Sequence, residues 1–265
     1  MPVAKHGIFA AVINSTIYMP GGATVQGLGA TNINQAFSVN TASTVSAASF
    51  VPAHITERSI VAAFGSGLST STASAASQPL PIELAGTTVT VVDRVGTARR
   101  APLFFASPDQ VNYQVPSGTL AGPVTIQVRA TDGRISTGAF EVRLAAPALF
   151  TINRSGDGPA AAIDGFNFTG PPFSPTQMNG SPNIIAFFGT ALGAEGTDQD
   201  GNLASTVNAT LNGNPVVVHY AGRAPGYTGL NQFNIGLPAG ITEGTHQLVI
   251  FRGGQASNLV SIRVQ

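Results

Sequence analysis

Short runs of Val, Ile, Thr and Phe recur along the chain, separated by clusters of Gly, Pro, Asn and Ser. Such runs are typical of β-strands, and the clusters between them are typical of turns. The clearest strands are expected at residues 88–92, 124–128, 216–220 and 247–251. No window has the sustained period of an amphipathic helix. The pattern therefore predicts an all-β protein of the sandwich or barrel type.

Two stretches of the sequence recur later in the chain. Residues 59–68 match residues 183–192, with Ile, Ala, Phe, Gly and Leu at equivalent positions. Residues 110–118 match residues 232–240, with Gln, Asn, Pro and Gly at equivalent positions. The offset of about 120 residues is the length of a domain, not of a solenoid repeat. The repeat therefore predicts two copies of one β-sandwich.

We expect the first sandwich at residues 40–145 and the second at residues 146–265. Residues 1–39 match neither copy. Within them, residues 9–22 have the pattern of a hairpin, with a turn at Asn14 and Ser15, and residues 34–39 are a further candidate strand. The first strand of this hairpin, residues 8–13, is apolar on both faces, as a strand buried within another sheet would be.

The composition excludes several classes of function. Of the 265 residues only 9% are charged, and 12 Lys and Arg balance 12 Asp and Glu. So few cations argue against a nucleic-acid partner. The longest weakly polar stretch, residues 184–194, is far shorter than the ~20 residues that span a bilayer, so we expect no membrane span. Without Cys there is no disulfide, thiolate nucleophile or zinc–sulfur site. Zero net charge also removes the repulsion that keeps proteins monomeric.

Several motifs in the two halves of the chain point to the same protein family. They are VSAASF at 45–50, SIVAAFGSGL at 59–68, PLP at 79–81 with LAGTTV at 84–89, APLFFASPDQVNYQVP at 101–116, and YAG at 220–222 with APGYTGLNQ at 224–232. With these motifs, residues 43–265 resemble the Solibacter-type uncharacterised C-terminal domain family of secreted acidobacterial proteins. The resemblance implies tandem immunoglobulin-like domains related to the IPT/TIG type, at the C-terminal end of large exported proteins. That family has no established activity, so no site residues follow from it.

A second resemblance concerns the N-terminal segment. HG at 6–7, AVI at 11–13, IY at 17–18 and GG at 21–22, followed by Asn34 and Phe37, resemble one blade of a kelch propeller. A propeller needs at least four blades, about 4–8 in most cases. A lone hairpin is marginally stable in water. The segment must therefore dock on its own sandwich, insert into a neighbouring copy or be the stump of a longer chain, and we expect a docked or exchanged segment.

Candidate metal ligands are few. Asp198, Asp200 and Asn202 place oxygen ligands at alternate positions beside Gly201, like part of a calcium loop. A complete loop needs a later bidentate Glu, and the next acidic residue is the distant Glu243. A turn between strands explains the segment as well. The four His residues lack the spacing of a zinc protease, and His54 with Glu57 is a weak pair on a turn. We expect no cofactor.

Candidate catalytic and sugar-binding residues are equally sparse. Ser66 lies between two glycines, but Phe64 stands where a nucleophile elbow needs Gly, and the repeat has Thr190 in place of Ser66. This pattern favours a strand-end turn and predicts no enzyme. The sequence has no Trp, which weakens the case for a sugar platform. Tyr113, Tyr220 and Tyr227 are candidates for a small platform, although core or strand-face roles are favoured for each.

Two functional hypotheses follow. The first is a non-enzymatic, extracellular structural or adhesive protein that assembles with copies of itself into a filament by N-terminal strand exchange. Strand addition supplies main-chain hydrogen bonds and side-chain pockets, and a head-to-tail contact that does not close gives an open filament. The contact residues would be Ile8, Phe9, Val12, Ile13, Ile17 and Tyr18. The alternative is a C-terminal module of a larger secreted protein that binds a glycan or a cell surface.

Overall fold

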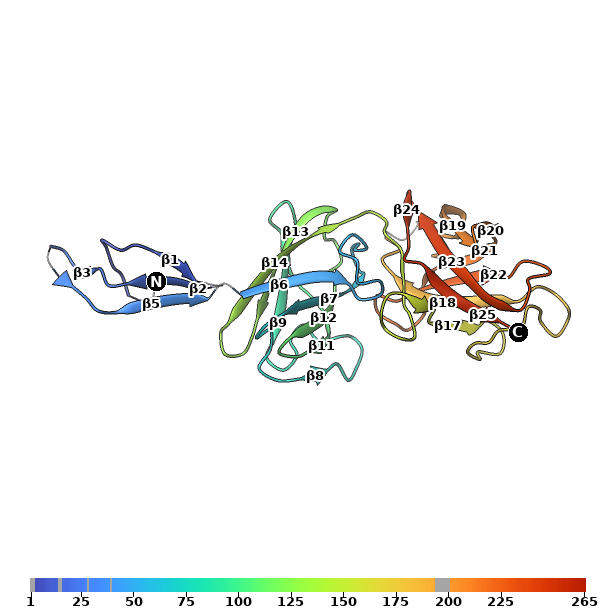
Figure 1. Ribbon diagram of the computed structural model, residues 1–265, viewed down its shortest axis with the longest axis horizontal. Helices are drawn as coiled ribbons and strands as arrows, with labels where there is room; N and C mark the ends of the chain where they lie inside the picture. The colour runs from blue at the N-terminus through green and yellow to red at the C-terminus, as the bar shows by residue number, and fades with distance from the viewer. Residues whose placement is uncertain (1–2, 14–15, 28, 39, 194–200) are drawn as a thin grey trace.

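The computed structural model describes residues 3–13, 16–27, 29–38, 40–193 and 201–265. They form an elongated row of three parts, with the N-terminal strands at one end and the C-terminus near the other (Figure 1). The regular elements of the described residues are strands, apart from one 3-10 turn at Ala204–Thr206. The prediction of an all-β protein is confirmed. None of the described residues belongs to a helix long and apolar enough to cross a membrane.

The N-terminal part is a small antiparallel sheet with a hairpin beyond it. The strands are β1 (Ala11–Ile13), β2 (Thr16–Pro20), β3 (Ala23–Val25), β4 (Gly29–Ala30) and β5 (Asn34–Ser38). The sheet has the order β1-β2-β5, and β3 pairs with β4. Val12 lies opposite Ile17, as the hairpin pattern predicts. The expected turn at Asn14 and Ser15, and Val39 at the end of the third expected strand, lie outside the described residues.

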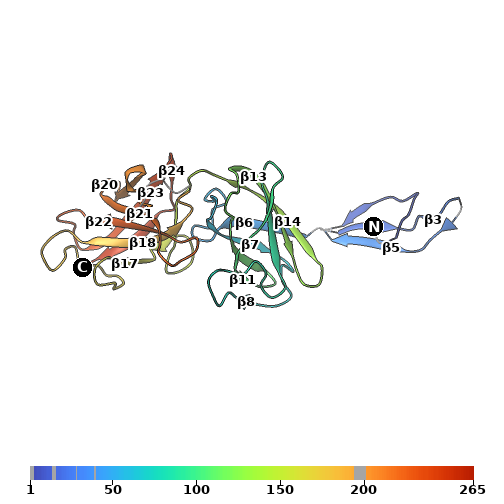
Figure 2. The ribbon, with the colours of Figure 1, turned by 180° about the vertical axis from the view of Figure 1, so that it is seen from behind.

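One expectation for this segment is wrong, and one of its two expected arrangements, docked or exchanged, is not seen in the described residues. The first strand does not extend over residues 8–13 but begins at Ala11, because the chain before it bridges to a different strand, with His6 opposite Ala23. Docking on its own sandwich is not observed either. In opposite views the segment projects away from the sandwich that follows it (Figures 1 and 2). The first buried apolar residue of the neighbouring core is Ala42.

The next part of the chain is built from nine strands. They are β6 (Asn40–Ser46), β7 (Ile60–Gly65), β8 (Ala73–Ser74), β9 (Thr88–Val92), β10 (Ala98–Arg100), β11 (Leu103–Ala106), β12 (Gln110–Gln114), β13 (Gly122–Arg129) and β14 (Ile135–Val142). Their order is β10-β9-β13-β14-β6-β7-β12-β11-β8. β6 pairs with β14 through Asn40 and Thr41 and then with β7 from Ala42 to Ser46. The two halves of the path share one core, to which β9, β13, β7 and β12 each contribute alternate residues.

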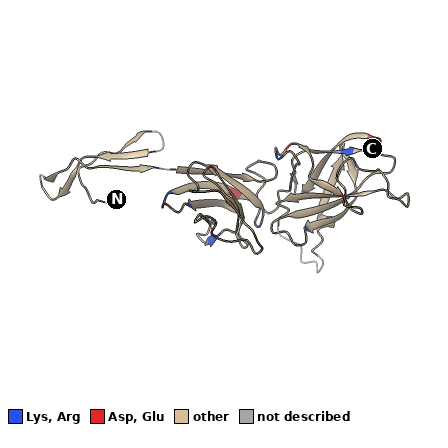
Figure 3. Cartoon of the chain, turned by 90° about the horizontal axis from the view of Figure 1, so that it is seen from below, with Lys and Arg blue, Asp and Glu red and all other residues tan. Residues whose placement is uncertain are grey.

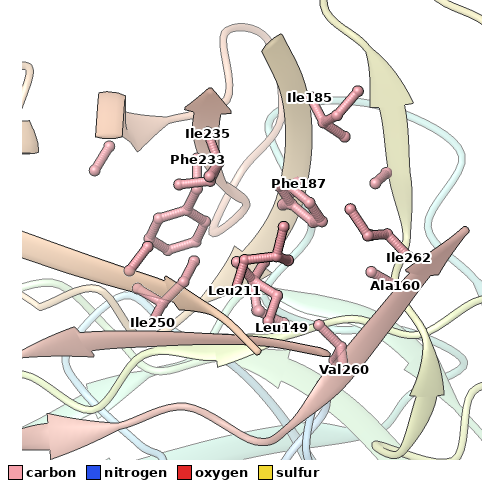
Figure 4. Packing of buried hydrophobic residues seen from close by; sticks show 14 of the residues in the cluster. Leu149, Ala160, Ile185, Phe187, Leu211, Phe233, Ile235, Ile250, Val260 and Ile262 are labelled. Atoms are coloured by element: carbon pink, nitrogen blue, oxygen red, sulfur yellow. The ribbon is translucent and has the colours of Figure 1, made fainter. Parts of the chain in front are cut away.

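The last part has two sheets that enclose a second core. Its strands are β15 (Ala148–Leu149), β16 (Gly158–Pro159), β17 (Ala162–Asp164), β18 (Ile184–Thr190), β19 (Val207–Leu211), β20 (Asn214–Val216), β21 (Val218–Arg223), β22 (Asn231–Gly236), β23 (Gly244–Arg252), β24 (Gln255–Ala256) and β25 (Val260–Val264). One sheet runs β15-β18-β22-β21, with β17 on β18, and the other runs β16-β25-β23-β19-β20, with β24 on β23. Phe187 and Phe233 of the first sheet face Leu211 and Ile250 of the second (Figure 4).

Three of the four strands expected from the sequence are present, and the fourth is divided. Residues 88–92 are β9, and residues 124–128 and 247–251 lie within β13 and β23. Residues 216–220 are not one strand: β20 ends at Val216 and β21 begins at Val218, on the other sheet. The chain crosses between sheets at Val217, whose side chain is consequently exposed.

Candidate functional site

The first candidate surface is the N-terminal sheet. Phe9, Val12 and Ile13 are 90%, 70% and 59% exposed. All three residues of β1 are exposed. The other three residues of the expected contact, Ile8, Ile17 and Tyr18, are half-buried. Large apolar side chains exposed together on one short sheet mark a surface that another protein can cover.

The edges of this sheet lack the usual protection against pairing. Natural edge strands carry charges, Pro or bulges that block pairing with another chain. β10 has Arg99 and Arg100, and β20 has Pro215. β1 and β5, the two edges of the N-terminal sheet, contain neither a charged residue nor Pro. Lys5 is the only Lys, Arg, Asp or Glu in residues 1–56, and Figure 3 shows this end almost wholly in tan.

Lys5 itself does not guard an edge. Its Nζ donates to the backbone oxygen of Met19, at 3.3 Å, and to that of Ile33. Both acceptors belong to the same N-terminal segment, so the one ammonium group ties the segment together. The arrangement is a sheet with two uncharged edges and exposed apolar side chains on its edge strand β1, which is chemically suited to strand addition.

The second candidate site is a cleft of about 580 Å³ between the two large parts of the chain. One wall comes from the part of the chain that contains β6 to β14 and includes Arg58, Gln78 and Gln114. The opposite wall comes from the part that contains β15 to β25 and includes Arg223 and the loop that holds Tyr227. Ligand sites occur preferentially at such boundaries between domains.

Hydrogen bonds across the junction fix the walls of this cleft. Thr190 Oγ1 accepts from the Ile60 N–H at 2.9 Å and donates to the Gly229 backbone oxygen at 2.9 Å. Thr228 Oγ1 donates to Gln78 Oε1 at 2.7 Å. Gly229 has a φ of +72°, and a Cβ there would lie 2.8 Å from Ile60 Cγ1. The close approach requires glycine at this position.

Two guanidinium groups line the cleft. Arg58 Nη2 donates to Ser117 Oγ at 3.0 Å, and its Nε lies 3.5 Å from Glu57 Oε1. Burial, and secondarily the positive charge of Arg58, lower the pKa of Arg223 from its ordinary value. Both arginines are lining residues of the cleft.

Of the three tyrosines considered from the sequence, only Tyr227 is strongly exposed, at 68%. Tyr113 is fully buried, and its hydroxyl lies 3.1 Å from Thr44 Oγ1. Tyr220 is half-buried, and its hydroxyl donates to the Arg223 backbone oxygen at 2.8 Å. The structure thus leaves one tyrosine as a platform and places it in the cleft.

The remaining candidates from the sequence do not form a site together. His54 Nδ1 lies 2.9 Å from Ser49 Oγ, and burial followed by the charge of Arg143 lowers the pKa of His54. Ser66 is exposed at the bend after β7. Asn202 Oδ1 accepts from the Ala204 and Ala221 backbone N–H groups, at 3.0 and 3.1 Å.

The calcium candidates Asp198 and Asp200 lie outside the described residues. Within the described ranges, no three His, Asp or Glu residues are grouped in a way that would hold a metal ion. The cleft itself was not found from the sequence, because its two walls come from residues far apart in the chain. The sequence does contain a signal: residues 224–230, just before the second Gln-x-Asn, are a longer link than residues 107–109, which precede the first.

Comparison with known proteins gives distant structural likenesses. No family model and no curated protein matches the chain. A mixed-linkage glucan utilization protein of Bacteroides ovatus, SGBP-B, solved with a heptasaccharide, has a TM-score of 0.37 and 11% identity over 99% of this chain. This chain spans 54% of that protein, about half its length.

Two further solved structures illustrate the range of these likenesses. Two domains of the S-layer protein SbsC have a TM-score of 0.28 and 15% identity, covering 85% of this chain and 97% of that one. A titin tandem of immunoglobulin domains has a TM-score of 0.21 and 5% identity, covering 80% and 90%. The neighbours are binding, structural and immunoglobulin-like proteins, and likenesses this distant carry no argument about function.

Proposed function

We propose that this chain is a non-enzymatic extracellular structural and adhesive protein that assembles with copies of itself into a filament through its N-terminal strands. One observation carries the proposal: the sheet β1-β2-β5 projects from the rest of the chain with exposed apolar side chains and uncharged edges (Figure 1). The resemblance to secreted tandem immunoglobulin-like domains supports an extracellular location.

The physical reason is the state of β1. Its three residues pair with β2 on one side, so their outward N–H and C=O groups form an open ladder. Pairing with a sheet edge of another copy would satisfy these groups and cover Val12 and Ile13. Fully burying one such side chain contributes about 1.5–3 kcal/mol.

The shape of the chain favours a filament over a closed dimer. The N-terminal strands and the C-terminus lie toward opposite ends of an elongated molecule (Figure 1). A donor at one end and an acceptor elsewhere on the next copy form a head-to-tail contact, which propagates when the rotation does not close. The low charge of the surface, shown in Figure 3, offers little repulsion between copies.

The test is a charge placed on the edge strand. Val12→Lys introduces the side chain that natural edges use to prevent pairing. We expect the unaltered protein to scatter light as particles of high mass and Val12→Lys to remain at 26.9 kDa. The matched control is Val217→Lys, at another strongly exposed valine, 62% exposed, outside the N-terminal sheet.

Negative-stain microscopy of the same samples shows the form of the particles. Long particles with a regular repeat are expected for the unaltered chain and for Val217→Lys, and single elongated particles for Val12→Lys. Removal of residues 1–39 should have the same effect as Val12→Lys. The proposal would be overturned if Val12→Lys and the chain without residues 1–39 both formed filaments. It would also be overturned if the unaltered protein were monomeric at high concentration.

A further inference from the structure

The cleft between the two sandwiches has features that filament assembly does not use. It is formed jointly by the two copies of the repeat, it is held by hydrogen bonds on both walls, and it lies away from the projecting N-terminal sheet (Figures 1 and 2). A cleft with fixed walls loses little freedom when a ligand binds, because its polar groups are already positioned.

The loop that carries Tyr227 differs from its counterpart in the first copy. There, residues 107–109 form a short link between β11 and β12. In the second copy β21 pairs with β22 as β11 pairs with β12, and the longer link that follows β21 turns through Gly226 and Gly229, with φ values of +79° and +72°. Backbone bonds from Ala224 N–H to Leu230 O, at 2.9 Å, and from Tyr227 N–H to Ala224 O, at 3.2 Å, close this loop.

The consequence is an aromatic ring held in the open. Tyr227 is 68% exposed on a closed loop, although burial of such a ring would stabilise the fold. A tyrosine has an apolar face and a polar tip, and it loses only two rotatable bonds when it is fixed. An exposed ring on a fixed loop in a cleft is suited to stack on a flat or gently puckered ligand.

Three amide side chains line the same cleft, and the protein holds one end of each. Gln78 Oε1 accepts from Thr228, Gln114 Nε2 donates to the Arg58 backbone oxygen at 3.0 Å, and Asn231 Oδ1 accepts from the Leu192 N–H at 3.1 Å. Within the described part of the chain, the other end of each amide has no protein partner. One polar end is therefore oriented and still has hydrogen-bonding capacity.

We propose that this cleft binds a neutral saccharide, with Tyr227 stacked on one sugar ring and the amides of Gln78, Gln114 and Asn231 bonded to its hydroxyl groups. A saccharide offers apolar C–H faces and hydroxyls that both donate and accept. An amide has a donor end and an acceptor end, which matches hydroxyl groups better than it matches a purely anionic ligand. The cleft volume of about 580 Å³ is in the range of pockets that hold small ligands.

Arg58 and Arg223 add hydrogen-bond donors to the cleft, but they do not determine whether its ligand is neutral or anionic. Arg58 is engaged by Glu57 and Ser117, so it acts as part of the wall. The charge of the ligand is therefore a separate arm of the experiment. A neutral sugar requires Tyr227, whereas a purely electrostatic ligand requires only the arginines.

The experiment is calorimetric titration of the full chain with four hexasaccharides: cellohexaose, xylohexaose, mannohexaose and hexagalacturonate. We expect binding of at least one neutral hexasaccharide. Tyr227→Ala should weaken that binding at least tenfold, Tyr227→Phe should keep it within threefold because the ring remains, and Gln114→Ala should weaken it three- to tenfold. Phe166→Ala removes an exposed aromatic ring outside the cleft lining and should leave binding unchanged.

The possible outcomes decide the proposal. Failure of all three neutral hexasaccharides to bind overturns it, as does equal binding by Tyr227→Ala and Phe166→Ala. Binding of hexagalacturonate alone, retained in Tyr227→Ala, also overturns it, because the cleft would then be a site for anions. Repeating the titrations in the Val12→Lys chain separates this result from assembly, since the cleft contains no N-terminal residue.

Discussion

Replacing Thr190 by Val tests whether one hydroxyl holds the two sandwiches together. Thr190 is fully buried; it accepts from the Ile60 N–H across the junction and donates to the Gly229 oxygen within its own part of the chain. Val keeps the shape and removes both bonds. A buried group without a partner costs about 1–3 kcal/mol, so two give an upper value of about 6 kcal/mol. Because Gly229 lines the cleft, water can reach its oxygen, so only the Ile60 N–H is left without a partner. We therefore expect the free energy of unfolding to fall by about 1–3 kcal/mol.

Urea unfolding followed by circular dichroism measures this loss, and small-angle scattering measures whether the two sandwiches keep their arrangement. The control is Ser66→Ala, because Ser66 occupies the equivalent position of the first copy and is exposed. A surface change of that kind stays within about 0.5 kcal/mol. Equal unfolding midpoints for Thr190→Val and Ser66→Ala, together with unchanged scattering, would refute the reasoning.

Two further predictions concern stability. The pKa of His54 is lowered by burial and by Arg143, so the unfolded chain binds the proton more readily and stability falls as the pH drops below about 6.5. The urea midpoint should therefore decrease from pH 7.5 to 5.5 more in the unaltered chain than in His54→Gln, and an identical decrease would exclude this role. We also propose that residues 40–145 and 146–265 unfold as separate units. Phe187→Ala, in the second core, should then cost about 3–5 kcal/mol and lower one calorimetric transition while the other stays in place; a joint shift would contradict it.

The sequence predicted those parts of the fold that depend on neighbouring residues. β9 and the central residues of β13 alternate between core and surface, which is a local pattern. The pairing of β1 with β2 is also local, since only two residues separate the strands in the sequence. The change of sheet at Val217 was missed because an apolar run continues through the corner. Nothing in the local pattern encodes where the N-terminal segment lies relative to the first sandwich.

The cleft was beyond local reasoning for a similar reason. Gln78 and Thr228, which bond across it, are 150 positions apart in the chain. Sequence reasoning can point to such residues only by comparing the two copies of the repeat and noting where they differ. The loop of Tyr227 is longer than residues 107–109, the corresponding link of the first copy, and it lines the same cleft as Arg58.

Equivalent positions of the two copies support the placement of the proposed binding site at the junction. Ser66 ends a strand in solvent, whereas its counterpart Thr190 is buried and bonds the copies to each other. Residues 107–109 form a short link between β11 and β12, whereas the counterpart β21 is joined to β22 by the longer loop that holds Tyr227. In both cases the second copy contributes to the junction a feature that the first copy lacks. Loss of the junction bond in Thr190→Val should therefore weaken saccharide binding even though Thr190 does not line the cleft, while Val12→Lys, at the projecting end of the chain, should leave that binding intact.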